Sequence, residues 1–145
     1  MDRNIKIGAD PEVFIKDKDN KIVPAFLLVN GTKDYPTPIS EEGHAIQSDN
    51  VMLEYNIPPC STKEEFIKAN NFVLNYCRET ICEPNGYTLS IEASSHVGEE
   101  YLVNPQATEM GCLADYNAYT KEQNVIERNS QTLRSAGKIE CQTIQ

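Results

Sequence analysis

Apolar and polar residues alternate along several short stretches of the chain, the period-two pattern of β-strands with one buried face. Pro11 interrupts the first stretch. Because proline donates no hydrogen bond to a neighbouring strand, we expect that strand at a sheet edge or with a bulge. Turn residues at 17–20 predict a hairpin between the first two stretches, and Pro58-Pro59 is expected to end the fourth. Strands are predicted over 5–15, 21–29, 45–47, 50–57 and 87–93.

After residue 60 the period changes to that of a helix. Ser61-Thr62-Lys63-Glu64 matches a capping box, in which the serine oxygen accepts a backbone N–H bond and the glutamate reaches back. Pro84-Asn85-Gly86 supplies a stop. We predict a helix from about Thr62 to Cys82, lying on one side of a sheet because only one of its faces is apolar. That face carries Phe66, Ala69, Val73, Cys77 and Ile81, widened by Ile67 and Leu74.

The pattern weakens in the last third of the chain. It predicts a short helix over 99–103, an extended segment over 111–120, a polar loop over 121–130 and a last strand within 132–139. The chain contains no internal repeat. We therefore expect an α+β fold, a mostly antiparallel twisted sheet with one long helix packed on one face. A single domain, complete or incomplete, spans residues 1–145.

Composition narrows the class of protein. The chain has 145 residues, of which 39% are hydrophobic and 24% charged, enough for a sizeable core. Its 22 acidic and 13 basic residues give a formal net charge of −9. This excess argues against direct binding to nucleic acid, which basic patches drive. It does not exclude the binding of nucleotides, because bound divalent ions reverse the local charge.

The five cysteines are odd in number and contain no Cys-x-x-Cys pair, which argues against a disulfide scaffold or a closed zinc site. Reduced thiols are typical of a cytoplasm. The N-terminal residues show no signal region, and no apolar run approaches the roughly 20 residues that cross a bilayer. We therefore expect a cytoplasmic protein without a membrane partner.

Carboxylates occupy strand positions that ordinarily carry threonine or valine. Asp10 and Glu12 share one side of the first predicted strand, roughly 7 Å apart at about 3.4 Å per residue. Glu54 points away from the apolar side of the fourth strand, and its burial without a partner would be costly. Asp49 precedes that strand. The apolar side is predicted to carry Val51, Leu53, Tyr55 and Ile57, and the other side Met52, Glu54 and Asn56.

The residues alone leave two interpretations of these carboxylates open. Carboxylates gathered on one face of a sheet repel each other unless cations or protons neutralise them, which favours a shared magnesium site. Alternatively, Asp10 and Glu12 are solvated residues of an edge strand and Asp49 belongs to a turn.

Four other polar residues are weaker candidates. Glu92 fits the wet face of a surface strand, and His44 and His96 lie in predicted loops, so we expect all three at the surface. Arg134 lies among small residues that would let a ligand approach the backbone, or it forms a surface salt bridge.

Four segments resemble, in the same order, the phage-type carboxylate–amine ligases (COOH-NH2 ligase type 2), whose relatives have a glutamine-synthetase-like fold. The segments are 8–14, 47–56, Gly111-Cys112 with 115–120, and 132–137. The resemblance implies an ATP- and magnesium-dependent enzyme. In such an enzyme ATP phosphorylates a carboxylate, and an amine then displaces phosphate to form an amide. Its substrates would be small-molecule or peptide carboxylates and amines.

The same resemblance implies roles for individual residues. Asp49 would support the metal or the incoming amine, and with Glu54 and Arg134 it would form the catalytic set. Arg134 would also steady a phosphate or carboxylate of the nucleotide or substrate, and Asn56 would join it in cofactor binding. The implied metal ligands are Asp10, Glu12 and Glu54.

The chain departs from the family after Ala136-Gly137. The family continues with a Gly-His-x-His-x-Gly strand, whereas residues 138–145 contain no histidine. The resemblance therefore implies a member truncated after the first half of the domain. An unpaired sheet edge would then invite a second copy or a host protein. An inactive relative that binds or inhibits another protein, and a fragment made by a frameshift or cloning boundary, are the alternatives.

Overall fold

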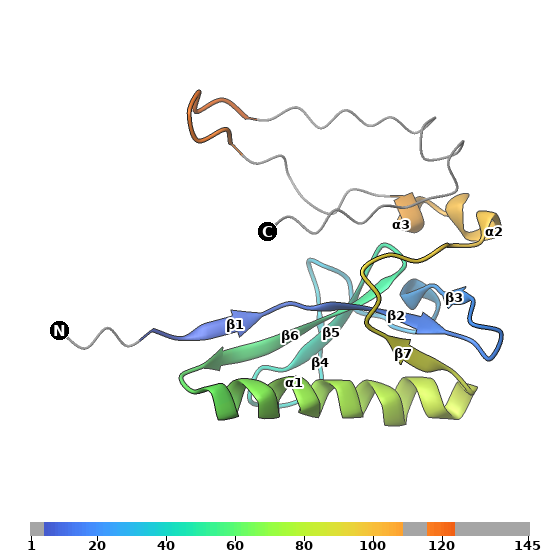
Figure 1. Cartoon of the computed structure of the whole chain (residues 1–145), viewed down its shortest axis with the longest axis horizontal. Helices are drawn as coiled ribbons and strands as arrows, with labels where there is room; N and C mark the ends of the chain where they lie inside the picture. The colour runs from blue at the N-terminus through green and yellow to red at the C-terminus, as the bar shows by residue number, and fades with distance from the viewer. Residues whose placement is uncertain (1–4, 109–115, 124–145) are drawn as a thin grey trace.

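A twisted antiparallel sheet with one long helix across one face forms the body of the protein (Figure 1). The computed structural model describes residues 5–108 and 116–123. The strands are β1 (Ile7–Ala9), β2 (Glu12–Lys16), β3 (Ile22–Val23), β4 (Thr37–Pro38), β5 (Ala45–Asp49), β6 (Met52–Cys60) and β7 (Thr88–Ser90). The helices are α1 (Lys63–Cys77), α2 (Glu99–Leu102) and α3 (Pro105–Thr108), with shorter turns η1 (Ala25–Leu27), η2 (Arg78–Cys82) and η3 (Glu83–Asn85).

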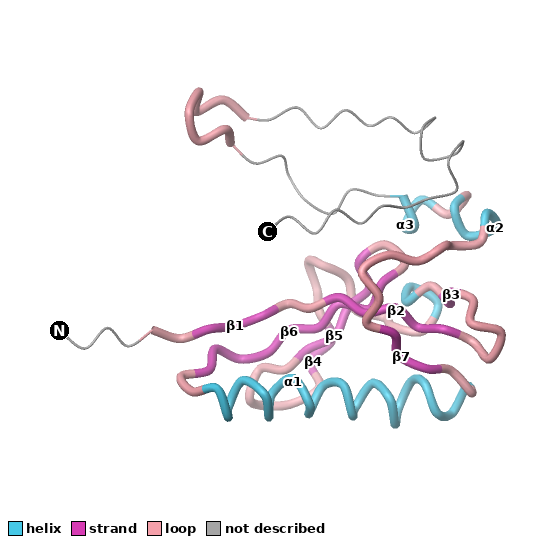
Figure 2. The backbone as a smooth tube through the Cα atoms, in the orientation of Figure 1, coloured by secondary structure: helices cyan, strands magenta, loops and turns pink. Residues whose placement is uncertain are grey.

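The sheet order is β3-β2-β6-β5-β4, with β1 also beside β6 and β7 also beside β2 (Figure 2). Each strand pair in the described residues is antiparallel. The predicted α+β class, with a mostly antiparallel sheet and one long helix, is confirmed.

The first predicted strand is two strands, because the chain breaks at Asp10-Pro11. Both parts pair with β6, and the Pro11 carbonyl accepts a hydrogen bond from the Tyr55 N–H at 3.1 Å. The sequence predicted an edge position or a bulge at Pro11, and the edge position does not apply to β2, which pairs with β3, β6 and β7. It holds for β1, whose partner among the described strands is β6 alone.

The pair Pro58-Pro59 does not end the fourth predicted strand, because β6 continues to Cys60. Ile7 lies opposite Cys60 and Ala9 opposite Ile57, so β6 has one more residue than β1 in this interval. This irregularity accommodates two residues that donate no backbone hydrogen bond.

The predicted hairpin is confirmed, but its second strand is shorter than expected. Ile15 pairs with Val23, and the Asp17 carboxylate closes the turn by accepting the Asp19 and Lys21 N–H groups, each at 2.9 Å. Pro24 follows β3, and the chain then turns into η1. The predicted strand over 87–93 is likewise reduced to β7.

Helix α1 begins one residue later than its predicted capping box. Thr62, rather than Ser61, accepts the Glu65 N–H at 3.1 Å, and Glu65 reaches back to the Ser61 and Thr62 N–H groups. The α-helix ends at Cys77, where the π-helical turn η2 takes over. Ile67, predicted to widen the apolar face, is 47% exposed.

Two hydrophobic clusters lie on opposite faces of the sheet. The larger one joins the sheet to α1 and includes Leu53, Tyr55 and Val73. The smaller one joins the other face to the α2–α3 segment, which lies across the sheet from α1 (Figure 1). Val51, predicted on the α1 side, belongs to the smaller cluster because it lies in the turn before β6. The smaller cluster comprises Phe14, Ile22, Val51, Met52, Val97 and Ala107.

The described part of the C-terminal third bears on two predictions. The helix expected over 99–103 is present as α2. Residues 116–123 contain a turn closed by a bridge between Tyr116 and Gln123, rather than one extended segment. The strand predicted within 132–139 lies outside the described residues.

Candidate metal centre

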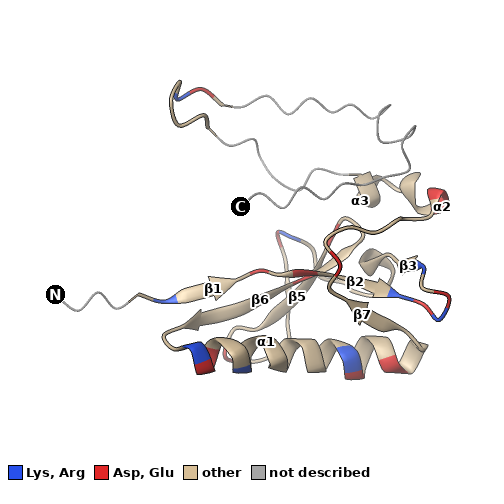
Figure 3. Cartoon of the chain, in the orientation of Figure 1, with Lys and Arg blue, Asp and Glu red and all other residues tan. Residues whose placement is uncertain are grey.

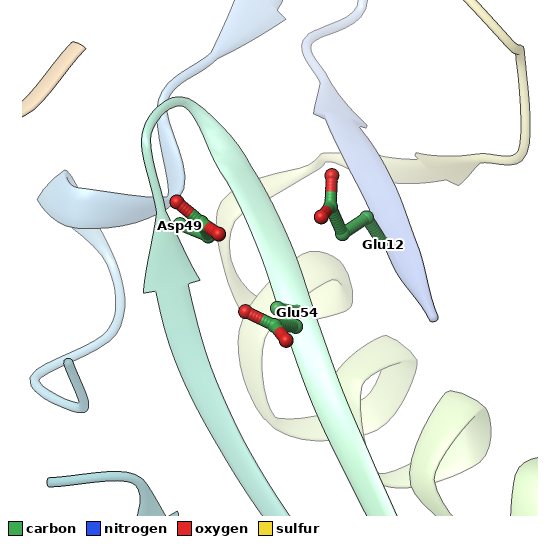
Figure 4. A group of neighbouring side chains, drawn as sticks. All are labelled: Glu12, Asp49 and Glu54. Carbon is green, nitrogen blue, oxygen red and sulfur yellow. The ribbon is translucent and has the colours of Figure 1, made fainter. Parts of the chain in front are cut away.

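Three carboxylates from three neighbouring strands converge on the face of the sheet opposite α1 (Figure 4). Glu12 of β2 lies directly opposite Glu54 of β6, and Glu54 lies opposite Gln47 of β5. Asp49, two residues after Gln47, points to the same side. One oxygen atom from each of Glu12, Asp49 and Glu54 lies within 4.8 Å of the other two. Strand register thus brings Glu12 to Asp49 and Glu54, which lie far from it in the sequence.

The three carboxylates carry more negative charge than their surroundings offset. Glu54 is only 6% exposed; burial raises its pKa above the ordinary value, and the charge of Asp49 raises it further. Partial burial also raises the pKa of Glu12, although much of that residue faces solvent, and the charges of Asp49 and Glu54 add to the effect. A proton or a cation would relieve this repulsion.

Two amide side chains, of the buried Gln47 and the partly exposed Asn56, hold Glu54 in place. Gln47, 3% exposed, donates from Nε2 to Glu54 Oε2 at 2.8 Å, and Asn56 donates from Nδ2 to Gln47 Oε1 at 2.9 Å. The bond from Gln47 lowers the pKa of Glu54, against the effect of burial. Asn56, predicted to bind the cofactor, supports Gln47 here, and its cofactor role stays a prediction. Gln47 was not predicted as a site residue. The signal that could have found it is its position two residues before Asp49, which places both side chains on one face of the strand.

Asp10, predicted as a metal ligand, lies outside the group of three. It occupies the break between β1 and β2. Its charge still raises the pKa of both Glu12 and Glu54. Asp10 therefore adds to the negative potential of the site.

A lysine at the rim partly offsets this charge. Lys33 Nζ lies 3.7 Å from Asp49 Oδ2, and its charge lowers the pKa of Glu12 and Glu54. Gly31 anchors the same loop, because the Ser48 N–H and hydroxyl both donate to its carbonyl, at 2.9 and 3.2 Å. Lys33 was not predicted as a site residue, because no pattern in the amino-acid sequence shows that its loop meets β5.

The acidic segments of the sheet meet on neighbouring strands, whereas α1 carries charges of both signs (Figure 3). Glu92 does not join the carboxylates. It pairs with the buried Lys16, whose Nζ lies 2.6 Å from Glu92 Oε2, and this bond lowers the Glu92 pKa. Its expected surface position is confirmed, as is that of His96. Arg134 lies outside the described residues.

The expected surface position of His44 is wrong. Its side chain is buried, with Nδ1 2.7 Å from the Ser40 hydroxyl and the ring centroid 4.6 Å from that of Phe72. The ring packs the loop before β5 against α1. His44 therefore contributes packing between this loop and Phe72 of α1.

The described cysteines Cys60, Cys77 and Cys82 are all buried and free of disulfides. Burial raises the pKa of Cys77 to about 12, so its thiol stays protonated and unreactive near neutral pH. Cys112 and Cys141 lie outside the described residues.

No family model, no curated protein and no solved structure matches this chain. The resemblance to carboxylate–amine ligases therefore stands on the quoted residues alone. Among the described residues, the helices are too short or too polar to cross a membrane.

Proposed function

We propose that this chain is an ATP- and magnesium-dependent carboxylate–amine ligase, or a truncated member of that family, in which Glu12, Asp49 and Glu54 hold the divalent cation. The observation that carries the proposal is the convergence of these carboxylates within 4.8 Å. Sheet and helix would correspond to the first half of a glutamine-synthetase-like domain, with the carboxylates on the open face. The chain would act in the cytoplasm, of a host cell if a phage encodes it.

The donor set fits magnesium. Carboxylate oxygens are the protein ligands this ion prefers, and a site with few protein ligands leaves positions for water and phosphate oxygens. Bound there, the cation would offset charge on the transferring phosphoryl group. The chain itself positions the ligands: the Gln47 amide fixes one oxygen of Glu54, and Lys33 places a positive charge at the rim beside Asp49.

Isothermal titration calorimetry with ATP tests the binding part of the proposal. With magnesium present we expect saturable heat, and with EDTA in place of magnesium we expect that heat to disappear. Glu54→Gln should weaken binding at least about tenfold, since even residues that only support a metal ligand have effects of this size. Glu79→Gln, which removes an exposed carboxylate of η2, should leave it unchanged. Heat without magnesium dependence, or no heat, would contradict the proposal.

The ligase step has a separate test. Incubation with magnesium, ATP, hydroxylamine as the amine and pools of amino and dicarboxylic acids should release ADP and form a hydroxamate. Glu54→Gln should abolish both products. Magnesium-dependent ATP binding without any carboxylate-dependent ADP release would instead favour the inactive relative that binds another protein.

A further inference from the structure

The outer edge of β1 is open among the described residues. One side of β1 pairs with β6, and none of the other described strands lies on its second side. Because the Pro11 carbonyl and Ala9 are engaged with β6, alternation directs the backbone groups of Lys6, Gly8 and Asp10 outward. An edge with unpaired N–H and C=O groups is a template for another strand.

The side chains of this edge are apolar on one side. Ile5 is 69% and Ile7 60% exposed, although both lie in line with Ala9, which packs against the larger hydrophobic cluster. The α1-side core thus continues onto an uncovered strand. Water-exposed isoleucines on an open edge are what most natural sheets avoid.

The charges on β1 select a second copy of the same strand as the partner. A basic segment precedes β1 and an acidic one follows it (Figure 3). In an antiparallel pair of two β1 strands centred on Gly8, Lys6 of each copy lies opposite Asp10 of the other. The same register places Ile7 opposite Ala9, on the apolar side. Centring the pair on Lys6 instead would oppose two lysines, which is unfavourable.

We infer that β1 is a dimerisation strand, which pairs antiparallel with β1 of a second copy about a two-fold axis through Gly8. The two strands join two sheets into one, and the inference is independent of the carboxylate cluster.

Sedimentation equilibrium of the full chain tests the inference. As protein concentration rises, the weight-average mass should increase from 16.3 kDa toward twice that value. Lys6→Glu sets two like charges opposite each other at both ends of the strand pair and should weaken association at least about tenfold. Combining it with Asp10→Lys reverses both charges and should restore the dimer. Lys18→Glu, the same charge change in an exposed turn, is the matched control.

These variants separate the possible outcomes. Both substituted residues are exposed, so the fold should be retained. A constant mass of 16.3 kDa at all concentrations would overturn the inference, as would association that Lys6→Glu does not weaken. Failure of the double charge reversal to restore the dimer would also overturn it.

Discussion

At the scale of single residues, Glu54 shows how the candidate site lowers the stability of the folded state. Its carboxylate is buried beside Asp49, and the hydrogen bond from Gln47 offsets only part of the burial. A buried acid with a raised pKa destabilises the folded state when it is ionised. Such residues are typical of functional sites, where stability is lower than the scaffold would allow.

Glu54→Gln should therefore raise stability at neutral pH, by about 0.5–2 kcal/mol, the usual range of single stabilising substitutions. Burial raises the folded-state pKa of Glu54 above its ordinary value, so the destabilising effect is absent at pH values below that ordinary pKa. The effect grows as pH rises through the folded-state pKa and is then constant. Urea unfolding of both proteins from pH 3.5 to 8 measures this difference.

Glu79→Gln is the control, because Glu79 is exposed in η2 and should show no such trend. A Glu54→Gln protein that is less stable than the parent at neutral pH would mean that an ionised Glu54 is needed for the fold. That result would contradict the account of the site.

Lys33 is expected to compete with a divalent cation. Its ammonium group lies beside Asp49, and a cation bound by the three carboxylates would repel it. Lys33→Met should tighten binding of Mn²⁺ by about fivefold, the upper end of what an exposed charge pair contributes. Titration followed by Mn²⁺ electron paramagnetic resonance gives the affinity directly. Lys21→Met, a comparable change in the β2–β3 turn, should leave it unchanged.

At the scale of elements, periodicity predicted the existence of the main strands and of α1, but boundaries depended on tertiary contacts. Pro58-Pro59 is typical of a strand end, yet β6 continues past it to Cys60 because it pairs there with β1. Ser61 and Thr62 are equally good caps locally, and packing of α1 on the sheet selects the second. His44 was expected at the surface because no local pattern shows that Phe72 lies opposite it.

The choice of cap is directly testable. Thr62→Ala removes the side chain that accepts the Glu65 N–H and should reduce the free energy of unfolding by about 1 kcal/mol. Ser61→Ala should have a much smaller effect, because the structure engages the Ser61 backbone rather than its hydroxyl. Urea denaturation at neutral pH compares the two. A larger loss for Ser61→Ala would favour the capping box that the sequence predicted.

At the scale of the whole molecule, one helix covers one sheet face and leaves polar side chains in the middle of the other. Glu12 and Glu54 could be proposed from the sequence because each interrupts a strand pattern, and Asp49 because the family resemblance implied a role for it. Their common location could not, since it depends on the register of β2, β6 and β5. The roles of Gln47 and Lys33 could not be predicted either, because their contacts with Glu54 and Asp49 join different elements of the fold.

The most direct measurement is a crystal of the full chain soaked in MnCl₂, with data collected at a wavelength where manganese scatters anomalously. The account predicts one anomalous peak among the carboxylates of Glu12, Asp49 and Glu54, absent from crystals of Glu54→Gln. Carboxylates that stay free of manganese while the ion binds elsewhere, or nowhere, would contradict it.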